Sequence, residues 1–122
     1  MVRALRRGDA CCMTASERIV AEVTAWPGVT SGYGHRGELS FKVARKEIGH
    51  LHGDHSAHFG FPREVFAELH AAGRVTYHPV FPNKPGPAAR RINDDDDVRD
   101  VIALLRLNYD RVVTRYGLPG SG

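Results

Sequence analysis

The apolar residues near the end of the chain recur at steps of three and four, which is its strongest structural signal. This spacing predicts a long amphipathic helix that ends before Gly117 and Pro119. We expect Asn93 to cap the helix, with Asp94–Asp97 placing negative charge at its positive end. The apolar positions are Val98, Val101, Ile102, Leu105, Tyr109, Val112, Val113 and Tyr116.

Shorter segments ahead of this helix alternate between apolar and polar residues, as half-buried strands do. We expect strands at residues 29–33, 39–43, 47–52, 57–61, 75–80 and 88–92, and helices at 14–26 and 62–72. Tight turns join most neighbouring strands, which favours antiparallel pairing. The predicted fold class is therefore α+β, a small antiparallel sheet backed by helices, in the order α-β-β-β-β-α-β-β-α.

A chain of 122 residues has the length of one domain, and its 42% hydrophobic and 25% charged residues are those of an ordinary globular protein. We predict a disordered arm at residues 1–13, a single domain at 14–117 and a flexible tail at 118–122. Cys11 and Cys12 are adjacent, so we interpret them as free thiols. No membrane-spanning or secretory segment is evident, and we expect a cytoplasmic protein.

The formal net charge of +3 is weak evidence for a nucleic-acid partner. Residues 1–12 contain three Arg and one Asp, and they contribute +2 of that charge. The remainder of the chain is therefore close to neutral, whereas nucleic-acid-binding domains usually carry a basic surface.

Four of the seven histidines lie between Gly49 and His58. His50 and His52 should project from one face of a strand, because strand side chains alternate. If the following turn places His58 opposite His52, three imidazoles converge, with Asp54 near them. Such a group is suited to acid/base chemistry near neutral pH or to metal binding. In the alternative interpretation, these histidines simply face solvent.

The string His50-x-His52-x-Asp54-His55 also matches the core motif of metallo-β-lactamase-fold hydrolases. Its context differs, because those hydrolases have a strand ending in Asp upstream and further metal ligands far downstream. A metal-dependent hydrolase is therefore the weaker hypothesis. A metal ion at His50 and His52 stays open, but we favour a site without a cofactor.

Several motifs resemble the luciferase domain family of small bacterial and fungal proteins, over about residues 15–116. They are Trp-Pro-Gly-Val at 26–29, Glu-Ile-Gly-His-Leu-His-Gly-Asp at 47–54, Phe-Pro-Arg at 61–63 and Ile-Ala-Leu-Leu-Arg-Leu-Asn-Tyr at 102–109. The family takes its name from the luciferase of luminous fungi, which oxidises a hydroxylated pyrone with molecular oxygen. The resemblance implies an oxygenase-like pocket without a cofactor, but the substrate is not carried over, because fold does not fix function.

We expect this pocket to act on a small organic molecule. The predicted catalytic residues are His50, His52, Asp54 and His58, with His50 or His52 as the general base. The predicted substrate-binding residues are Arg63, His78 and Arg91. Arg63, Arg90 or Arg91 could hold an anionic oxygen.

Two other function classes remain open. The layout of helices and strands is similar to that of the MmcQ/YjbR family, whose members have been discussed as DNA binders. In that case Arg45, Lys46, Arg74, Arg90 and Arg91 would contact phosphates, and affinity would fall steeply with salt. A dimerising subunit, joined through edge strands or the last helix, is the third hypothesis, and we predict no particular oligomeric state.

Overall fold

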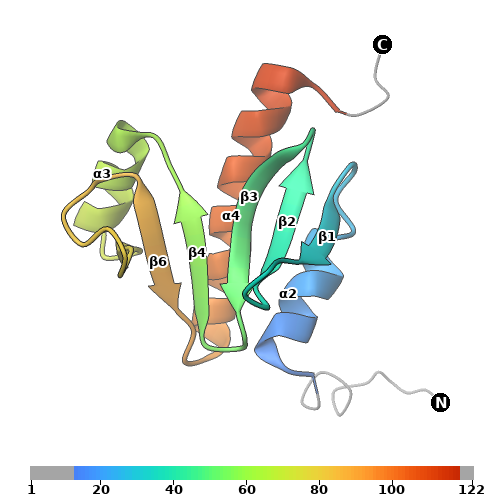
Figure 1. The fold of residues 1–122 in the computed structure, drawn as a ribbon, viewed down its shortest axis with the longest axis horizontal. Helices are drawn as coiled ribbons and strands as arrows, with labels where there is room; N and C mark the ends of the chain where they lie inside the picture. The colour runs from blue at the N-terminus through green and yellow to red at the C-terminus, as the bar shows by residue number, and fades with distance from the viewer. Residues whose placement is uncertain (1–12, 119–122) are drawn as a thin grey trace.

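The computed structural model describes residues 13–118, and it has the predicted α+β class and element order. Three helices accompany one antiparallel sheet of six strands, in the order β1-β2-β3-β4-β6-β5 (Figure 1). The helices are α2 (Ala15–Val23), α3 (Arg63–Ala71) and α4 (Asp95–Tyr116). The strands are β1 (Thr30–Tyr33), β2 (Leu39–Val43), β3 (Lys46–His52), β4 (Ser56–Gly60), β5 (Thr76–Tyr77) and β6 (Pro87–Arg91).

The predicted arm and tail, with Cys11 and Cys12, lie almost wholly outside the described residues. Between residues 13 and 118, no helix is both long and apolar enough to span a lipid bilayer.

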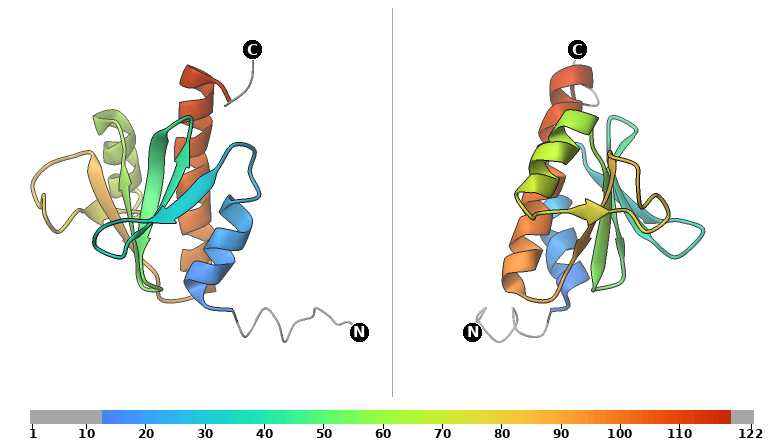
Figure 2. Two further views of the ribbon diagram at one scale, coloured as in Figure 1. Left: turned by 45° about the vertical axis from the view of Figure 1, so that its right-hand side comes forward. Right: turned by 90° about the vertical axis from the view of Figure 1, so that its left-hand side faces the viewer.

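Within residues 13–118, the helices all lie on one side of the sheet, and the other face carries no helix (Figure 2). On that second side, the β1–β2 hairpin and the loop between β5 and β6 project away from the helices (Figure 2). The hydrophobic core fills the space between the sheet and the helices, and includes Ile19, Phe41, Ile48, Leu51, Phe66, Val101, Leu104 and Leu105. The fold thus has one apolar, covered face and one polar, open face.

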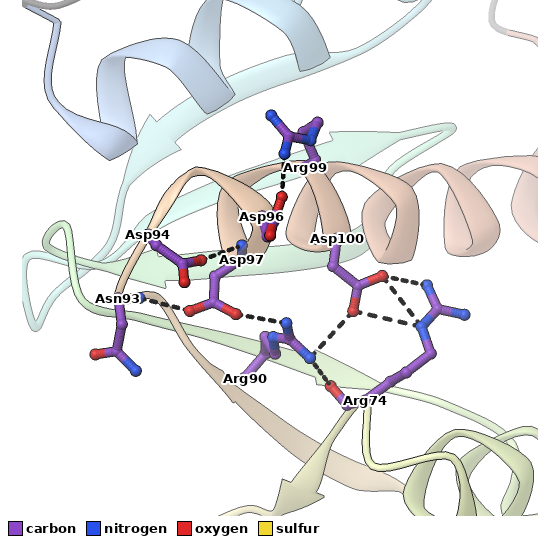
Figure 3. Close-up of polar contacts among 8 residues, drawn as sticks. All are labelled: Arg74, Arg90, Asn93, Asp94, Asp96, Asp97, Arg99 and Asp100. Atoms are coloured by element: carbon purple, nitrogen blue, oxygen red, sulfur yellow. Dashed lines mark hydrogen bonds and ion pairs between the residues drawn. The ribbon is translucent and has the colours of Figure 1, made fainter.

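The N-terminal end of α4 is held by carboxylates (Figure 3). Asp94 is the N-cap and accepts a hydrogen bond from the Asp97 amide at 2.9 Å, so the prediction that Asn93 caps the helix was wrong. Instead, the Asn93 amide donates to the Asp97 carboxylate at 2.8 Å. Both residue types can cap, but only a carboxylate also interacts favourably with the positive end of the helix dipole.

Arg90 joins this end of α4 to the sheet (Figure 3). Its guanidinium lies 2.6 Å from an Asp97 oxygen and 3.1 Å from an Asp100 oxygen, and it donates to the Arg74 carbonyl at 3.0 Å. Arg74 in turn pairs with Asp100 at 2.6 Å. The network therefore connects three parts of the fold: β6, the segment that follows α3, and helix α4. Both guanidinium groups are engaged by carboxylates, which leaves few of their hydrogen-bond donors for an external partner.

Two predicted elements are shorter in the structure. The first helix begins with a Thr14–Glu17 capping box but ends at Val23, three residues before Trp26. The strand predicted at 75–80 is only Thr76–Tyr77 long. Pro79 supplies no amide proton, and the chain turns at once: the Phe81 amide donates to the His78 carbonyl at 2.9 Å.

The middle of α4 lies very close to β3. A Cβ atom added to buried Gly49 would come within 2.6 Å of Leu105 Cδ2 and 3.0 Å of Phe59 Cδ1. Farther along α4, buried Asn108 donates its amide hydrogens to the carbonyl oxygens of Ile48 at 3.2 Å and Gly60 at 3.1 Å. Asn108 thus satisfies backbone groups at the point where the β3–β4 pairing ends.

The close approach at Gly49 makes Gly49→Ala destabilising. We expect a loss of about 1–3 kcal/mol of unfolding free energy, because the added methyl group overpacks the contact with Leu105. Urea denaturation followed by circular dichroism measures this loss. Gly60→Ala is the matched control, since a Cβ at that strand position meets no atom within 4 Å. Equal losses of unfolding free energy in Gly49→Ala and Gly60→Ala would contradict the explanation by overpacking against Leu105.

The two hydrogen bonds from the Asn108 amide predict that a substitution at this position also lowers the free energy of unfolding. Asn108→Asp keeps the side-chain shape but places one carboxylate oxygen beside two carbonyl oxygens, while the other oxygen still accepts a hydrogen bond from Arg111. We expect a net cost of about 2 kcal/mol at pH 7. Because protonation of the introduced carboxylate would remove the repulsion, the loss should shrink at acidic pH. Urea midpoints at pH 7 and pH 5, each relative to the unsubstituted chain, test both parts. A pH-independent loss would exclude the electrostatic explanation.

Candidate functional site

The histidine segment forms the β3–β4 hairpin, and its register decides which imidazoles meet. His50 pairs with His58, and His52 pairs with Ser56. The expectation that His58 lies opposite His52 was therefore wrong by two residues, because the turn contains only residues 53–55. A shift of two residues keeps every side chain on its face, so the three histidines still share one side of the hairpin.

Four imidazoles gather on the open face of the sheet. The ring centroids of His50 and His58 are 5.3 Å apart, and that of His52 lies 4.9 Å from His50 and 4.5 Å from His58. The fourth ring, that of His78, is 4.2 Å from His58. Each of these four side chains is partly exposed to solvent.

His78 reaches the cluster because the chain turns immediately after β5. Its backbone amide donates to the Pro87 carbonyl at 3.3 Å, which extends the β5–β6 pairing by one residue. The Val80 amide then donates to His78 Nδ1 at 3.1 Å. Since Nδ1 accepts this bond, it carries no proton, and neutral His78 has its proton on Nε2.

His50 has a carboxylate partner. Its Nδ1 lies 2.7 Å from Glu47 Oε2, and the hydroxyl of Ser40 lies 3.2 Å from Glu47 Oε1. An ionised carboxylate only accepts hydrogen bonds, so His50 Nδ1–H is the donor and Nε2 remains free. The bond from His50 is the main cause that lowers the pKa of Glu47.

Strand alternation alone does not predict the contact between Glu47 and His50. In a regular strand, residues 47 and 50 point to opposite faces, because three steps reverse the side. The structure has a bulge: Phe41 pairs with Gly49 while Lys42 pairs with Glu47, so Ile48 is the extra residue. The bulge returns Glu47 to the face of His50. The glycine at position 49 was the only signal, since glycine in a strand often marks a bulge.

His58 is the most buried part of the cluster. Its Nδ1 is inaccessible to solvent and has no hydrogen-bond partner among the described residues. Burial, followed by the neighbouring imidazoles of His78, His52 and His50, lowers the pKa of His58 to about 4. Burial also lowers the pKa of His78, with His50 and His52 adding to the effect. His58 is thus a neutral imidazole at physiological pH.

The other predicted site residues are placed differently. Arg91 lies on the histidine face, which is the open face of the sheet that carries His50, His52, His58 and His78. It does so because it pairs with Ser56, which itself pairs with His52. Asp54 is turned towards α2, where its carboxylate accepts a hydrogen bond from the Ser16 amide at 2.9 Å. Arg63 is exposed in the first turn of α3, on the helical side of the sheet (Figure 2). The structure therefore brings together four histidines and Arg91, but not Asp54 or Arg63.

A depression of about 440 Å³ lies at the β5–β6 edge of the sheet, and none of the four clustered histidines lines it. Its lining includes Arg91 and also Arg74, Arg90 and Asp97 of the ion-pair network. It approaches the cluster through Ser56, Ala89 and Pro79, which are pairing or chain neighbours of His52, His58 and His78. Its volume is in the range of small-molecule sites.

Comparison with protein-family models matches the luciferase domain to residues 45–108, just over half of the chain. The chain belongs to the luciferase domain family. The matched segment runs from the start of β3 into α4, and it includes the four clustered histidines, Glu47 and Asn108. Comparisons with curated proteins and with solved structures found no match.

The buried, neutral state of His58 predicts a pH-dependent stability. Unfolded histidine takes up a proton near pH 6.5, whereas folded His58 does so only near pH 4. The stability that depends on neutral His58 is therefore complete above pH 6.5 and is lost as the pH falls towards 4. We expect a loss on the order of 2 kcal/mol between pH 7.5 and 4.5, measured by urea denaturation.

His58→Gln should lose much less stability over the same pH range, because glutamine does not titrate. His35→Gln, at an exposed position in the β1–β2 loop, is the control and should behave like the unsubstituted chain. An acid-induced loss of equal size in His58→Gln and in the unsubstituted chain would show that another group causes it.

Proposed function

We propose that this luciferase-domain protein binds a small organic molecule with an acidic hydroxyl group on its histidine face, and prepares it for oxidation. The observation that carries the proposal is the convergence of His50, His52, His58 and His78 on the helix-free side of the sheet. Scattered surface histidines would not show such mutual distances, and the adjoining depression provides room for a ligand.

The hydrogen-bonding capacities of the cluster are complementary to an ionisable hydroxyl group. His50 is held by Glu47 and has its Nε2 free to accept a proton. His78, with its proton on Nε2, can donate to an anionic oxygen. Arg91 supplies a positive charge at the rim of the depression. A ligand hydroxyl could thus lose its proton to one imidazole while the resulting oxygen anion is held by another group.

Such deprotonation has a consequence for oxidation. A conjugated ring with an ionised hydroxyl group is rich in electrons and can pass them to molecular oxygen. This is the chemistry that the family's name implies. The protein would contribute the binding, the orientation and the proton transfer, while the ligand and oxygen exchange the electrons.

The nucleic-acid alternative has less support. Arg74 and Arg90 are paired with Asp97 and Asp100 (Figure 3), and a phosphate would have to displace these carboxylates. Arg45 lies at the tip of the β2–β3 hairpin, with φ of 65°. The basic residues named for this function are thus divided among a hairpin tip, an ion-pair network and the histidine face.

The test uses 4-hydroxy-2-pyrone as probe and 2-pyrone, which lacks the hydroxyl group, as its control. We expect calorimetry to detect binding of the hydroxylated compound only. His78→Phe, which keeps a ring but has no N–H, should weaken this binding roughly 10-fold or more, because a hydrogen bond to a charged group is lost. His35→Phe is the matched control and should bind normally. An oxygen electrode would then report whether the bound compound is oxidised.

Binding of both pyrones with equal affinity would contradict the role of the hydroxyl group. Unchanged binding to His78→Phe would exclude the histidine face as the site. If other acidic hydroxylated rings also failed to bind, the proposed substrate class would be wrong.

A further inference from the structure

We propose that His50, His52 and His58 form a binding site for one divalent transition-metal ion, with Glu47 and His78 around it. One ring nitrogen from each of the three histidines can be chosen so that all lie within 4.8 Å of one another. Around a tetrahedral ion with metal–nitrogen distances of about 2.0–2.1 Å, such nitrogens are about 3.3 Å apart. Small side-chain rotations would close this difference.

The backbone fixes the three ligands before any ion binds. His50 and His58 are direct partners on neighbouring antiparallel strands, and His52 follows on the same face of β3. The opposite face of this hairpin is buried against α4 through Leu51, Ala57 and Phe59. A change of register would expose these side chains, so the arrangement of the histidines is stabilised by the core.

Glu47 has the position that supports a metal ligand. In metal sites, a coordinating histidine commonly donates its other ring N–H to a carboxylate, which orients the ring and increases its basicity. The 2.7 Å bond between His50 Nδ1 and Glu47 leaves His50 Nε2 as the free ligand atom. Ser40 holds the second oxygen of the same carboxylate. A surface histidine that binds nothing would not require a carboxylate that is itself held by a second residue.

His58 and His78 have different roles at this site. His58 Nδ1 is buried without a partner among the described residues, which is costly for a polar atom unless an ion or a water molecule satisfies it. His78 is next to His58, but its Nδ1 accepts the Val80 amide and its Nε2 carries the proton. His78 is therefore a hydrogen-bond donor beside the ion and not a fourth ligand.

Three protein ligands leave a coordination position open, as in catalytic metal sites. Imidazole nitrogens favour zinc, iron, cobalt, nickel or copper over magnesium or calcium, which prefer oxygen ligands. Three neutral imidazoles also leave the full charge of the ion uncompensated. An anionic oxygen is then the natural fourth ligand. With the ion bound, His50 Nε2 is a ligand and not the proton acceptor, so the hydroxyl group gives its proton to water as its oxygen binds the ion. This last step rests on the proposed function, which supplies an ionised hydroxyl group within reach of His78.

The site differs from that of a metallo-β-lactamase-fold hydrolase. In the hydrolase motif, the residues corresponding to Asp54 and His55 would also be ligands. Here Asp54 binds the Ser16 amide at the start of α2, and His55 is exposed in the turn. His58, from the returning strand, takes the third position instead.

The test begins with metal alone. The full chain, prepared without a histidine tag and treated with a chelator, is titrated with cobalt(II) and zinc(II). We expect one ion per chain by calorimetry and, for cobalt, the intense visible absorption of a four-coordinate site. His52→Gln should weaken binding by 100-fold or more, and Glu47→Gln by roughly 10-fold to 100-fold.

Two controls separate this site from general histidine binding. His78→Gln should keep the metal, since His78 is not a ligand, and His35→Gln should be unaffected. Circular dichroism of each variant excludes unfolding as the cause of a loss. Several weakly bound ions per chain, or equal effects of His35→Gln and His52→Gln, would overturn the metal site.

The hydroxypyrone titration, repeated with and without zinc, separates this inference from the proposed function. Binding of the hydroxypyrone only to the zinc-loaded protein supports both. One bound ion with no hydroxypyrone binding supports the metal site and contradicts the proposed function. Hydroxypyrone binding by a protein that takes up no metal supports the function and overturns the metal site. Failure of both titrations overturns both.

Discussion

The packing of α4 across β3 and β4 is the contact on which the other features depend. Leu105 approaches so close to Gly49 that a methyl group there would collide with it, and Asn108 binds carbonyl oxygens on both strands. This contact covers one face of the β3–β4 hairpin completely. Because strand side chains alternate, covering Leu51 and Ala57 forces His50, His52 and His58 onto the open face. The core thus determines where the chemistry can lie.

The ion pairs of the protein differ between the two faces of the sheet. Arg90 is paired with Asp97 and Asp100 at the edge of the helical layer. On the open face, Glu47 contacts His50 and Ser40. Backbone hydrogen bonds lower the pKa of Glu38, and the charges of His50 and His52 contribute to lowering it. Burial, together with the neighbouring imidazoles, lowers the pKa of His58 and of His78, which favours the neutral forms of these two rings. Neutral imidazoles are the form that accepts a proton or coordinates a metal.

The sequence predicted the features that follow from period and turn chemistry. The spacing of the last helix, the alternation in β2 and the shared face of His50 and His52 all repeat at fixed steps, and each was confirmed. The features it missed depend on single local departures from a regular pattern. The bulge that brings Glu47 beside His50 requires knowledge of the pairing of both strands. The role of Asn108 depends on where β3 and β4 separate, which its own neighbours in sequence do not reveal.

Asp54 illustrates the same limit. Its sequence position in a histidine-rich hairpin favoured a place among the imidazoles, yet the tight turn of residues 53–55 directs it to the Ser16 amide. There it stabilises the start of α2, since a carboxylate near a helix N-terminus is favourable. The His78 ring shows the converse. It is distant in sequence and was predicted to bind substrate, and the turn before Val80 places it 4.2 Å from His58. The cluster thus combines three imidazoles placed by the pairing of β3 and β4 with a hydrogen-bond donor placed by the turn after β5.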